Sequence, residues 1–210
     1  MRHTLAGALS ALSLVSIAAA QIEDLSGPPF RDTTPVAISA DGSTVLVRWA
    51  DGNDNTQTHR WTAESGIEIL DSGALFASVG VALSADGRYA AGATNNGFTT
   101  TRAIRWNPDG SLSTLAISGS PVAVDISGDG QTVIGHRFGV GFVWTAATGP
   151  VDIDVPPGGG AQRMIAISQD GSAVVLFDGI SRRTYRWTHA TGTVDISPSA
   201  ATDVFPTSIS

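Results

Sequence analysis

The chain of 210 residues contains no cysteine, which excludes disulfide bonds, thiolate metal ligands and cysteine nucleophiles. An exported protein without cysteine is also more typical of bacteria than of eukaryotes. Lysine is absent too, so 12 arginines face 19 acidic side chains, and the formal net charge is −7. Nucleic-acid binding needs a basic stripe, and binding to anionic lipid needs a polybasic segment. We therefore expect neither partner.

Long apolar runs are missing everywhere except at the N-terminus. Arg2 and His3 are followed by an apolar run from Leu5 to Ile17 and by three small residues, 18–20. This layout predicts a signal peptide over residues 1–20, with cleavage before Gln21. The alternative, a membrane anchor, would need about 20 consecutive apolar residues. We expect a mature chain 21–210 with no membrane span, secreted or at the cell exterior, the periplasm included.

One short motif, (Ile/Leu)-Ser-x-Asp-Gly, occurs four times. Its serines are 45, 43 and 41 residues apart, at Ser39, Ser84, Ser127 and Ser168. A tryptophan follows each copy, at Trp61, Trp106, Trp144 and Trp187. A period of about 40–45 residues with such turn and tryptophan signals is typical of β-propeller blades.

Each repeat reads as four short strands joined by turns, over residues 36–70, 81–115, 122–153 and 164–196. Residues 22–25 resemble the last strand of a blade, and residues 204–209 resemble a first strand. The sequence therefore predicts an all-β fold, a β-propeller-like array of four four-stranded blades that is open or incomplete. Unpaired strand edges in such an array would allow self-association.

The Asp-Gly pair of each motif has the composition of a tight turn, in which aspartate bonds its own backbone and glycine takes a positive φ. A Ca²⁺ site is the alternative, but it needs six to eight oxygens at one point, and here each blade supplies one carboxylate. We expect structural turns and no metal. The residues concerned are Asp41, Gly42, Asp86, Gly87, Asp129, Gly130, Asp170 and Gly171.

The repeated tryptophans occupy one strand position in every copy, which favours a role in the core between blades. An exposed row of rings would instead suggest stacking on carbohydrate. Trp49 has no aromatic counterpart in the other repeats. It is the candidate for a ring that contacts a ligand.

The sequence contains few other indications of a metal site or a catalytic site. His59, His136 and His189 fall at different repeat positions, so a zinc site is not expected. No G-x-S-x-G elbow and no P-loop occurs. We expect no cofactor and assign no catalytic residue.

The repeat as a whole resembles the HAF-type extracellular repeat of bacterial secreted proteins. The resemblance rests on Ile-Ser-x-Asp-Gly, a valine-rich strand, Arg-Trp-Thr and Thr-x-Gly, and it covers roughly residues 22–210. Val143 departs from the pattern, since it replaces the arginine before Trp144. The resemblance implies a secreted, propeller-like repeat protein, and it supplies no catalytic residues to carry over.

Two hypotheses about function remain. The first is a secreted, non-enzymatic interaction or structural module whose partner is an extracellular protein or carbohydrate. The second is a fragment of a propeller-type polysaccharide hydrolase or lyase. One-off polar residues gathered at one face would favour the enzyme, whereas the deviations between these repeats are small residues and loop lengths.

Overall fold

The structure is a computed structural model, and it describes residues 32–50, 56–70, 77–95, 101–154 and 162–198. The predicted signal peptide 1–20 and the partial strands 22–25 and 204–209 lie outside these ranges. Sixteen strands make up the described fold, in four antiparallel sheets of four strands, each in chain order. The predicted all-β array of four four-stranded blades is confirmed, and no sheet is closed on itself.

Each sheet is one blade, and its bounds lie close to those of a sequence repeat. Blade 1 holds β1 (Asp32–Ile38), β2 (Thr44–Ala50), β3 (Thr56–Thr62) and β4 (Gly66–Ile69). Blade 2 holds β5 (Ala77–Leu83), β6 (Ala90–Asn95), β7 (Thr101–Trp106) and β8 (Leu112–Thr114). Blade 3 holds β9 (Val122–Ile126), β10 (Thr132–Arg137), β11 (Val140–Thr145) and β12 (Gly149–Ile153). Blade 4 holds β13 (Gln162–Ile167), β14 (Val174–Asp178), β15 (Arg183–Thr188) and β16 (Gly192–Asp195).

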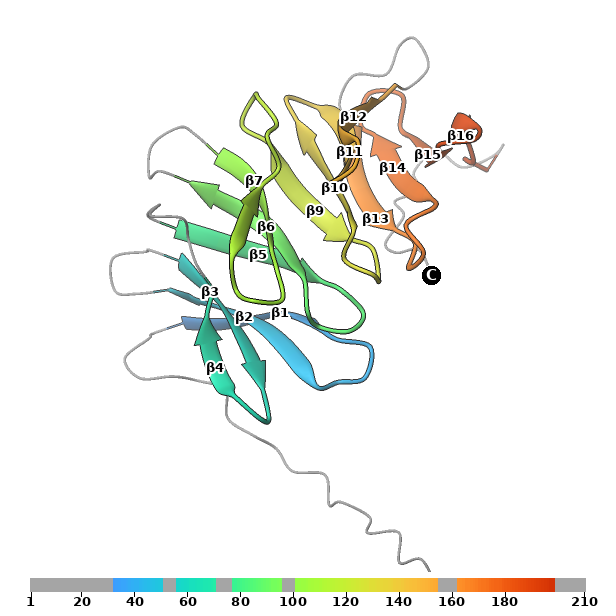
Figure 1. The fold of residues 1–210 in the computed structure, drawn as a ribbon. Helices are drawn as coiled ribbons and strands as arrows, with labels where there is room; N and C mark the ends of the chain where they lie inside the picture. Colours follow the sequence, from blue (N-terminus) through green and yellow to red (C-terminus); the bar gives the residue numbers. More distant parts are fainter. Residues whose placement is uncertain (1–31, 51–55, 71–76, 96–100, 155–161, 199–210) are drawn as a thin grey trace, which may run out of the picture.

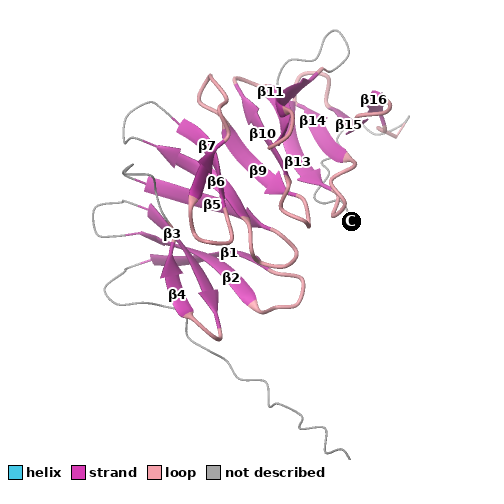
Figure 2. Ribbon diagram, in the orientation of Figure 1, coloured by secondary structure: helices cyan, strands magenta, loops and turns pink. Residues whose placement is uncertain are grey.

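The blades follow one another along an arc, with blade 1 and blade 4 at opposite ends (Figure 1). The first strands β1, β5, β9 and β13 contact one another in succession, while the fourth strand forms an edge of every sheet. Strands and their connections account for all of the described backbone, as Figure 2 shows. This arrangement stacks sheets face to face, so the core lies between blades.

Each first strand carries a bulge at the same position, two residues before its end. The register shifts skip Val36, Val81, Val124 and Ile165. A bulge turns one extra side chain and increases the local twist. Val36, Val81 and Val124 thereby pack into the cores between blades.

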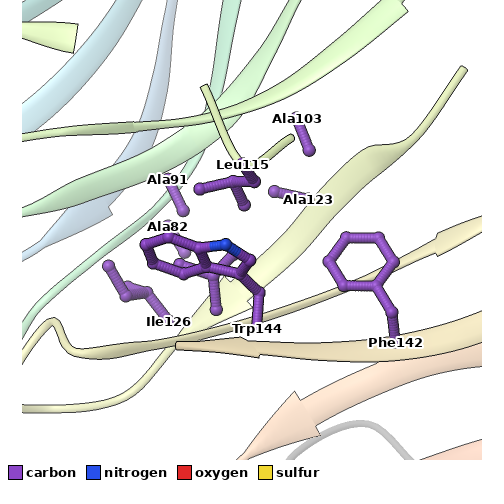
Figure 3. Packing of buried hydrophobic residues seen from close by; sticks show 9 residues of the cluster. Ala82, Ala91, Ala103, Leu115, Ala123, Ile126, Phe142 and Trp144 are labelled. Atoms are coloured by element: carbon purple, nitrogen blue, oxygen red, sulfur yellow. The ribbon is translucent and has the colours of Figure 1, made fainter. Parts of the chain in front are cut away.

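We call the face that a blade turns to the next blade in the chain its forward face, and the opposite one its back face. Strand alternation assigns side chains to the two faces, because paired residues of neighbouring strands share a face. The interface between blades 2 and 3 shows how the faces fit (Figure 3). Small side chains of blade 2, Ala82, Ala91 and Ala103, receive the large rings of Phe142 and Trp144 from blade 3. Large rings on blade 3 are thus matched by small side chains on blade 2.

Candidate functional site

All four Ser-x-Asp-Gly turns make the same hydrogen bonds. The serine hydroxyl donates to the aspartate Oδ1 at 2.6–2.7 Å. The same Oδ1 accepts the N–H of the residue after glycine at 2.9–3.0 Å. The serine Oγ also accepts the N–H of the residue five positions further along the chain at 2.9–3.0 Å. The turn glycines Gly42, Gly87, Gly130 and Gly171 have φ between 71° and 74°. Each carboxylate therefore acts within its own turn.

Hydrogen bonding also fixes the charge state of these carboxylates. The Ser39 and Ser43 hydrogen bonds lower the pKa of Asp41 to about 2, and those of Ser168 and Ser172 lower the pKa of Asp170 to about 2. The Ser127 hydroxyl likewise lowers the pKa of Asp129. Three of the four motif aspartates are thus held as carboxylate anions, and each accepts hydrogen bonds from its own turn. Within the described ranges, no group of three or more histidine and acidic side chains could hold a metal ion.

The turns of successive blades are joined by a row of backbone hydrogen bonds. In each, the N–H of the variable motif residue donates to the carbonyl of its counterpart in the next blade. The bonds run from Ala40 to Ala85 (2.8 Å), from Ala85 to Gly128 (2.9 Å) and from Gly128 to Gln169 (2.8 Å). A Cβ on Gly128 would lie 2.4 Å from the Gln169 Oε1, so the third contact is tight.

The Arg105-Trp106 pair of blade 2 connects this blade to both neighbours, because consecutive strand residues point to opposite faces. Arg105 lies on the forward face of blade 2, where its Nη1 donates to the Gly130 carbonyl of blade 3 at 3.0 Å. Its guanidinium also lies 5.3 Å from the centre of the Trp144 ring, within cation–π range. Arg60 repeats the pattern, donating to the Arg88 and Pro108 carbonyls of blade 2 at 3.2 and 3.4 Å.

The repeated tryptophans lie on the back faces. Trp106, Trp144 and Trp187 are buried in the three interfaces, each against the preceding blade. Trp61 occupies the same position in blade 1, yet it is only half-buried. The described residues place no blade against that back face, which is why the ring differs from its three counterparts.

Trp49, which the sequence singled out as a candidate ligand contact, is a buried residue in the structure. The side chain is 5 % exposed, and its ring stacks on that of His59 at a centroid distance of 3.9 Å. The alternation of β2 puts Val45, Val47 and Trp49 on the back face of blade 1, where Val47 and Trp49 are buried although no described blade lies against them.

The three histidines lie apart, as their repeat positions suggested. His59 is fully buried, and burial lowers its pKa. His136 lies on β10, where burial and the charge of Arg163 lower its pKa. His189 meets the edge of the Trp187 ring at 4.6 Å.

Asp125 makes a contact between blades that the repeat analysis did not identify. Its carboxylate accepts the N–H of Ile126 at 2.8 Å and, across the interface, the N–H of Ile167 of blade 4 at 3.0 Å. Burial raises its pKa. The signal was present, since the other repeats have alanine at this strand position, namely Ala37, Ala82 and Ala166.

Two surface hollows lie at equivalent positions of different repeats. The hollow between blades 1 and 2, about 210 Å³, is lined by Arg60 and Thr62 of blade 1 and by the Asp86-Gly87-Arg88 turn of blade 2. The hollow on blade 4, about 470 Å³, is lined by the equivalent Arg186 and Thr188, together with Ser172 and His189 to Thr191. In the described part of the chain, all residues lining the second hollow belong to blade 4.

No family model matches the sequence, and no curated protein matches it. Solved structures do resemble the fold. A putative TolB from Agrobacterium tumefaciens aligns with a TM-score of 0.58 at 17 % identity, over 84 % of this chain and 65 % of that one. TolB from Acinetobacter baumannii aligns with a TM-score of 0.53 at 16 % identity, over 79 % of this chain and 43 % of that one.

A third similar structure is virginiamycin B lyase from Staphylococcus aureus, in its catalytically inactive H270A form. It aligns with a TM-score of 0.52 at 14 % identity, over 84 % of this chain and 74 % of that one. The chain spans less than two thirds of either TolB structure. Identities this low show the fold alone, so the β-propeller architecture predicted from the repeats is the conclusion they support.

Proposed function

We propose that the chain is an exported, non-enzymatic repeat protein that acts as an interaction or structural module at the cell exterior. Its partner is an extracellular protein or a carbohydrate. The observation that carries this proposal is the use of the recurring polar residues. The motif serines and aspartates bind one another and the turn backbone, and Arg60 and Arg105 bind the neighbouring blade.

The N-terminal segment supports the export part of the proposal. Residues 1–20 have the charged start, apolar run and small-residue end of a signal peptide. No helix among the residues that the structure describes is long and apolar enough to cross a membrane. The resemblance to HAF-type extracellular repeats supports the same location.

Export is tested by expressing the full chain in a bacterial host and recovering it from the medium and the periplasm. We expect N-terminal sequencing and intact mass to place the first residue at Gln21 or within a few residues of it. Exported protein that still begins at Met1 would contradict the signal-peptide proposal.

The non-enzymatic part is tested on a panel of soluble polysaccharides. Reducing ends report hydrolysis, and absorbance of unsaturated sugars reports a lyase. We expect some of these polymers, or extracellular proteins of the host, to retain the chain on a column without turnover. Turnover that increases in proportion to the amount of protein would overturn this proposal in favour of the propeller-type hydrolase or lyase.

A further inference from the structure

We propose that two hairpin tips, one on blade 3 and one on blade 4, form a docking surface for an acidic segment of a partner protein that carries an apolar side chain. The blade 3 tip is residues 137–140, where β10 turns into β11, and the blade 4 tip is residues 179–183, where β14 turns into β15. This inference rests on the proposed interaction module and names the class of its partner.

Phe138, in the blade 3 tip, has a conformation and an exposure that do not favour the fold itself. Its side chain is 83 % exposed, the highest value among the exposed large apolar residues that the structure describes. Its φ is 46° and that of Gly139 is 79°. Two-residue hairpin connections of this kind are usually Asn-Gly or Asp-Gly, because a bulky side chain is disfavoured at positive φ. Backbone strain combined with such exposure indicates a contact with another molecule.

The ring of Phe138 is nevertheless held in one place. A Cβ on Gly119 would lie 2.7 Å from the ring, so the ring rests on the Gly119 backbone. Arg137 ties the same segment to the hairpin, since its Nη1 donates to the Ser118 carbonyl at 3.3 Å and its Nη2 donates to Asp152 at 2.8 Å. A ring that is already positioned loses little conformational freedom on binding, which favours affinity.

The blade 4 tip presents a second apolar side chain, Ile180, which is 64 % exposed. The N–H of Ile180 donates to the Asp178 Oδ1 at 3.1 Å, and the Ser181 hydroxyl donates to the Oδ2 of the same carboxylate at 2.6 Å. Asp178 itself is 0 % exposed. This carboxylate therefore organises the turn from below and adds no negative charge to the surface.

The two tips lie on the same side of the arc, where β10 and β14 both end (Figure 1). Gln162, the first residue of β13, connects them. Its N–H donates to the Gly139 carbonyl at 2.9 Å, and its Oε1 accepts the N–H of Gly141 at 2.9 Å. On its other side Gln162 pairs with Asp178, after which the blade 4 tip begins. The two apolar side chains are thus mounted on one hydrogen-bonded frame.

The charge of the tips indicates the chemistry of the partner. Every charged side chain in them is an arginine, namely Arg137, Arg182 and Arg183, although the chain as a whole has a net charge of −7. Arg183 pairs with Asp195 and is still 54 % exposed, so donors of its guanidinium remain accessible to a second carboxylate. The tips therefore complement an acidic partner.

The pair of apolar anchors favours a protein over a carbohydrate. A sugar could stack on the Phe138 ring, but the Ile180 side chain offers it neither a ring nor a hydrogen bond. Aromatic residues and arginine are the types enriched where proteins contact one another. An acidic protein segment with an apolar side chain would use both anchors and the arginines beside them.

The experiment selects short random peptides from a display library on the immobilised full chain, as the host processes it. We expect the recovered peptides to combine Asp or Glu with an apolar side chain. Fluorescence polarisation of labelled peptides then measures affinity. Phe138→Asn should weaken binding about tenfold or more, as expected of a hot-spot residue, and Arg183→Ala about threefold.

The Phe138→Asn variant also distinguishes an anchor from a structural residue, because Asn is preferred at this turn position. We expect its melting temperature to equal or exceed that of the unaltered chain. A lower value would assign the ring to the stability of blade 3 and overturn the proposal. Two exposed positions away from the tips serve as controls: Ile69→Asn on blade 1 and Arg88→Ala on blade 2 should leave peptide affinity unchanged.

Recovery of no peptide, or of peptides that bind Phe138→Asn as tightly as the unaltered chain, would overturn the proposal. Binding that depends on Phe138 but is directed to alginate, or to vesicles of phosphatidylserine and phosphatidylcholine, would overturn it in favour of a carbohydrate or a membrane. Retention on a column of host extracellular protein separates this inference from the proposed function. If Phe138→Asn is retained as well as the unaltered chain, the module stands and this docking surface does not.

Discussion

The interfaces within the arc and the two faces at its ends contain the same repeat positions, but some positions that the interfaces bury, such as that of Trp61, are only half-buried at the ends. Trp106 is 0 % exposed between blades 1 and 2, while Trp61, at the same position, faces no described blade and is half-buried. The residue type and its place in the repeat are identical. Burial, and with it the energetic role of the side chain, depends on the neighbour that the fold supplies.

The largest difference in the free energy of unfolding is expected between alanine variants of these two tryptophans. Trp106→Ala should lower the free energy of unfolding by about 3–5 kcal/mol, because it leaves a cavity in a filled interface. Trp61→Ala should cost only about 1–2 kcal/mol, since much of that ring stays in contact with water. Urea denaturation of both variants at low protein concentration measures the difference. Equal losses would show that the back face of blade 1 is covered in solution.

A smaller difference in the free energy of unfolding is expected between Ile153 and Ile196, which occupy the same repeat position in blades 3 and 4. Ile153 is buried between blades 3 and 4, so Ile153→Ala should cost about 2–4 kcal/mol. Ile196→Ala changes an exposed position and should stay within about 0.5 kcal/mol. Thermal melts of dilute protein compare the two. A large loss at Ile196 under monomeric conditions would mean that this face packs against its own chain.

The next difference in the free energy of unfolding is expected between variants of Arg105 and Arg186, which occupy the same repeat position. Arg105→Ala removes the bond to the Gly130 carbonyl and the contact with the Trp144 ring, and we expect a loss of about 2 kcal/mol. Arg186→Ala should stay within about 0.5 kcal/mol in the monomer. Arg105→Lys keeps the charge but not the planar group, so its loss should lie between these values. Chemical denaturation checks the order, and an Arg105→Ala variant as stable as Arg186→Ala would contradict it.

The smallest expected effect concerns the Ser-x-Asp-Gly turns, whose contribution to the stability of the fold depends on pH. The folded pKa of Asp41 and Asp170 is about 2, below the ordinary value of 3.8. Stabilisation from these carboxylates is therefore present above about pH 4 and is lost as the pH falls towards about 2. The half-buried Asp125 acts in the opposite sense, since its raised pKa favours the folded state as it becomes protonated.

Melting temperatures between pH 2 and pH 5 measure this response. Asp170→Asn should make the acid-induced decrease shallower. Glu64→Gln, at an exposed position between β3 and β4, should leave the decrease unchanged. A profile that Asp170→Asn does not alter would assign acid sensitivity to other groups.

The sequence was most informative where a side chain acts on its own backbone. The strand count, the turn positions and the direction of the Arg-Trp pair follow from local rules of hydrogen bonding and alternation, and these rules recur four times. Trp49 shows where such reasoning ends. Its departure from the repeat and the loop that follows it singled the ring out, but neither indicated that the side chain is only 5 % exposed.

Asp125 shows the opposite case. Its one-off position was visible, but its role was not, because the N–H that it accepts from Ile167 lies 42 residues away on another blade. A contact of this separation follows from how two sheets stack. The same holds for the chain of turn bonds from Ala40 to Gln169, which no single repeat contains.

The sequence by itself determined the unit of this protein: a four-stranded blade closed by a Ser-x-Asp-Gly turn, with arginine and tryptophan on opposite faces. These features depend on neighbouring residues and on one strand's alternation, so they are local. Only the tertiary structure decided which of the four equivalent tryptophans, and which of the equivalent isoleucines Ile38, Ile126 and Ile167, are buried. A blade interface requires a second blade, and among the described residues the blade at each end of the arc has one on a single side.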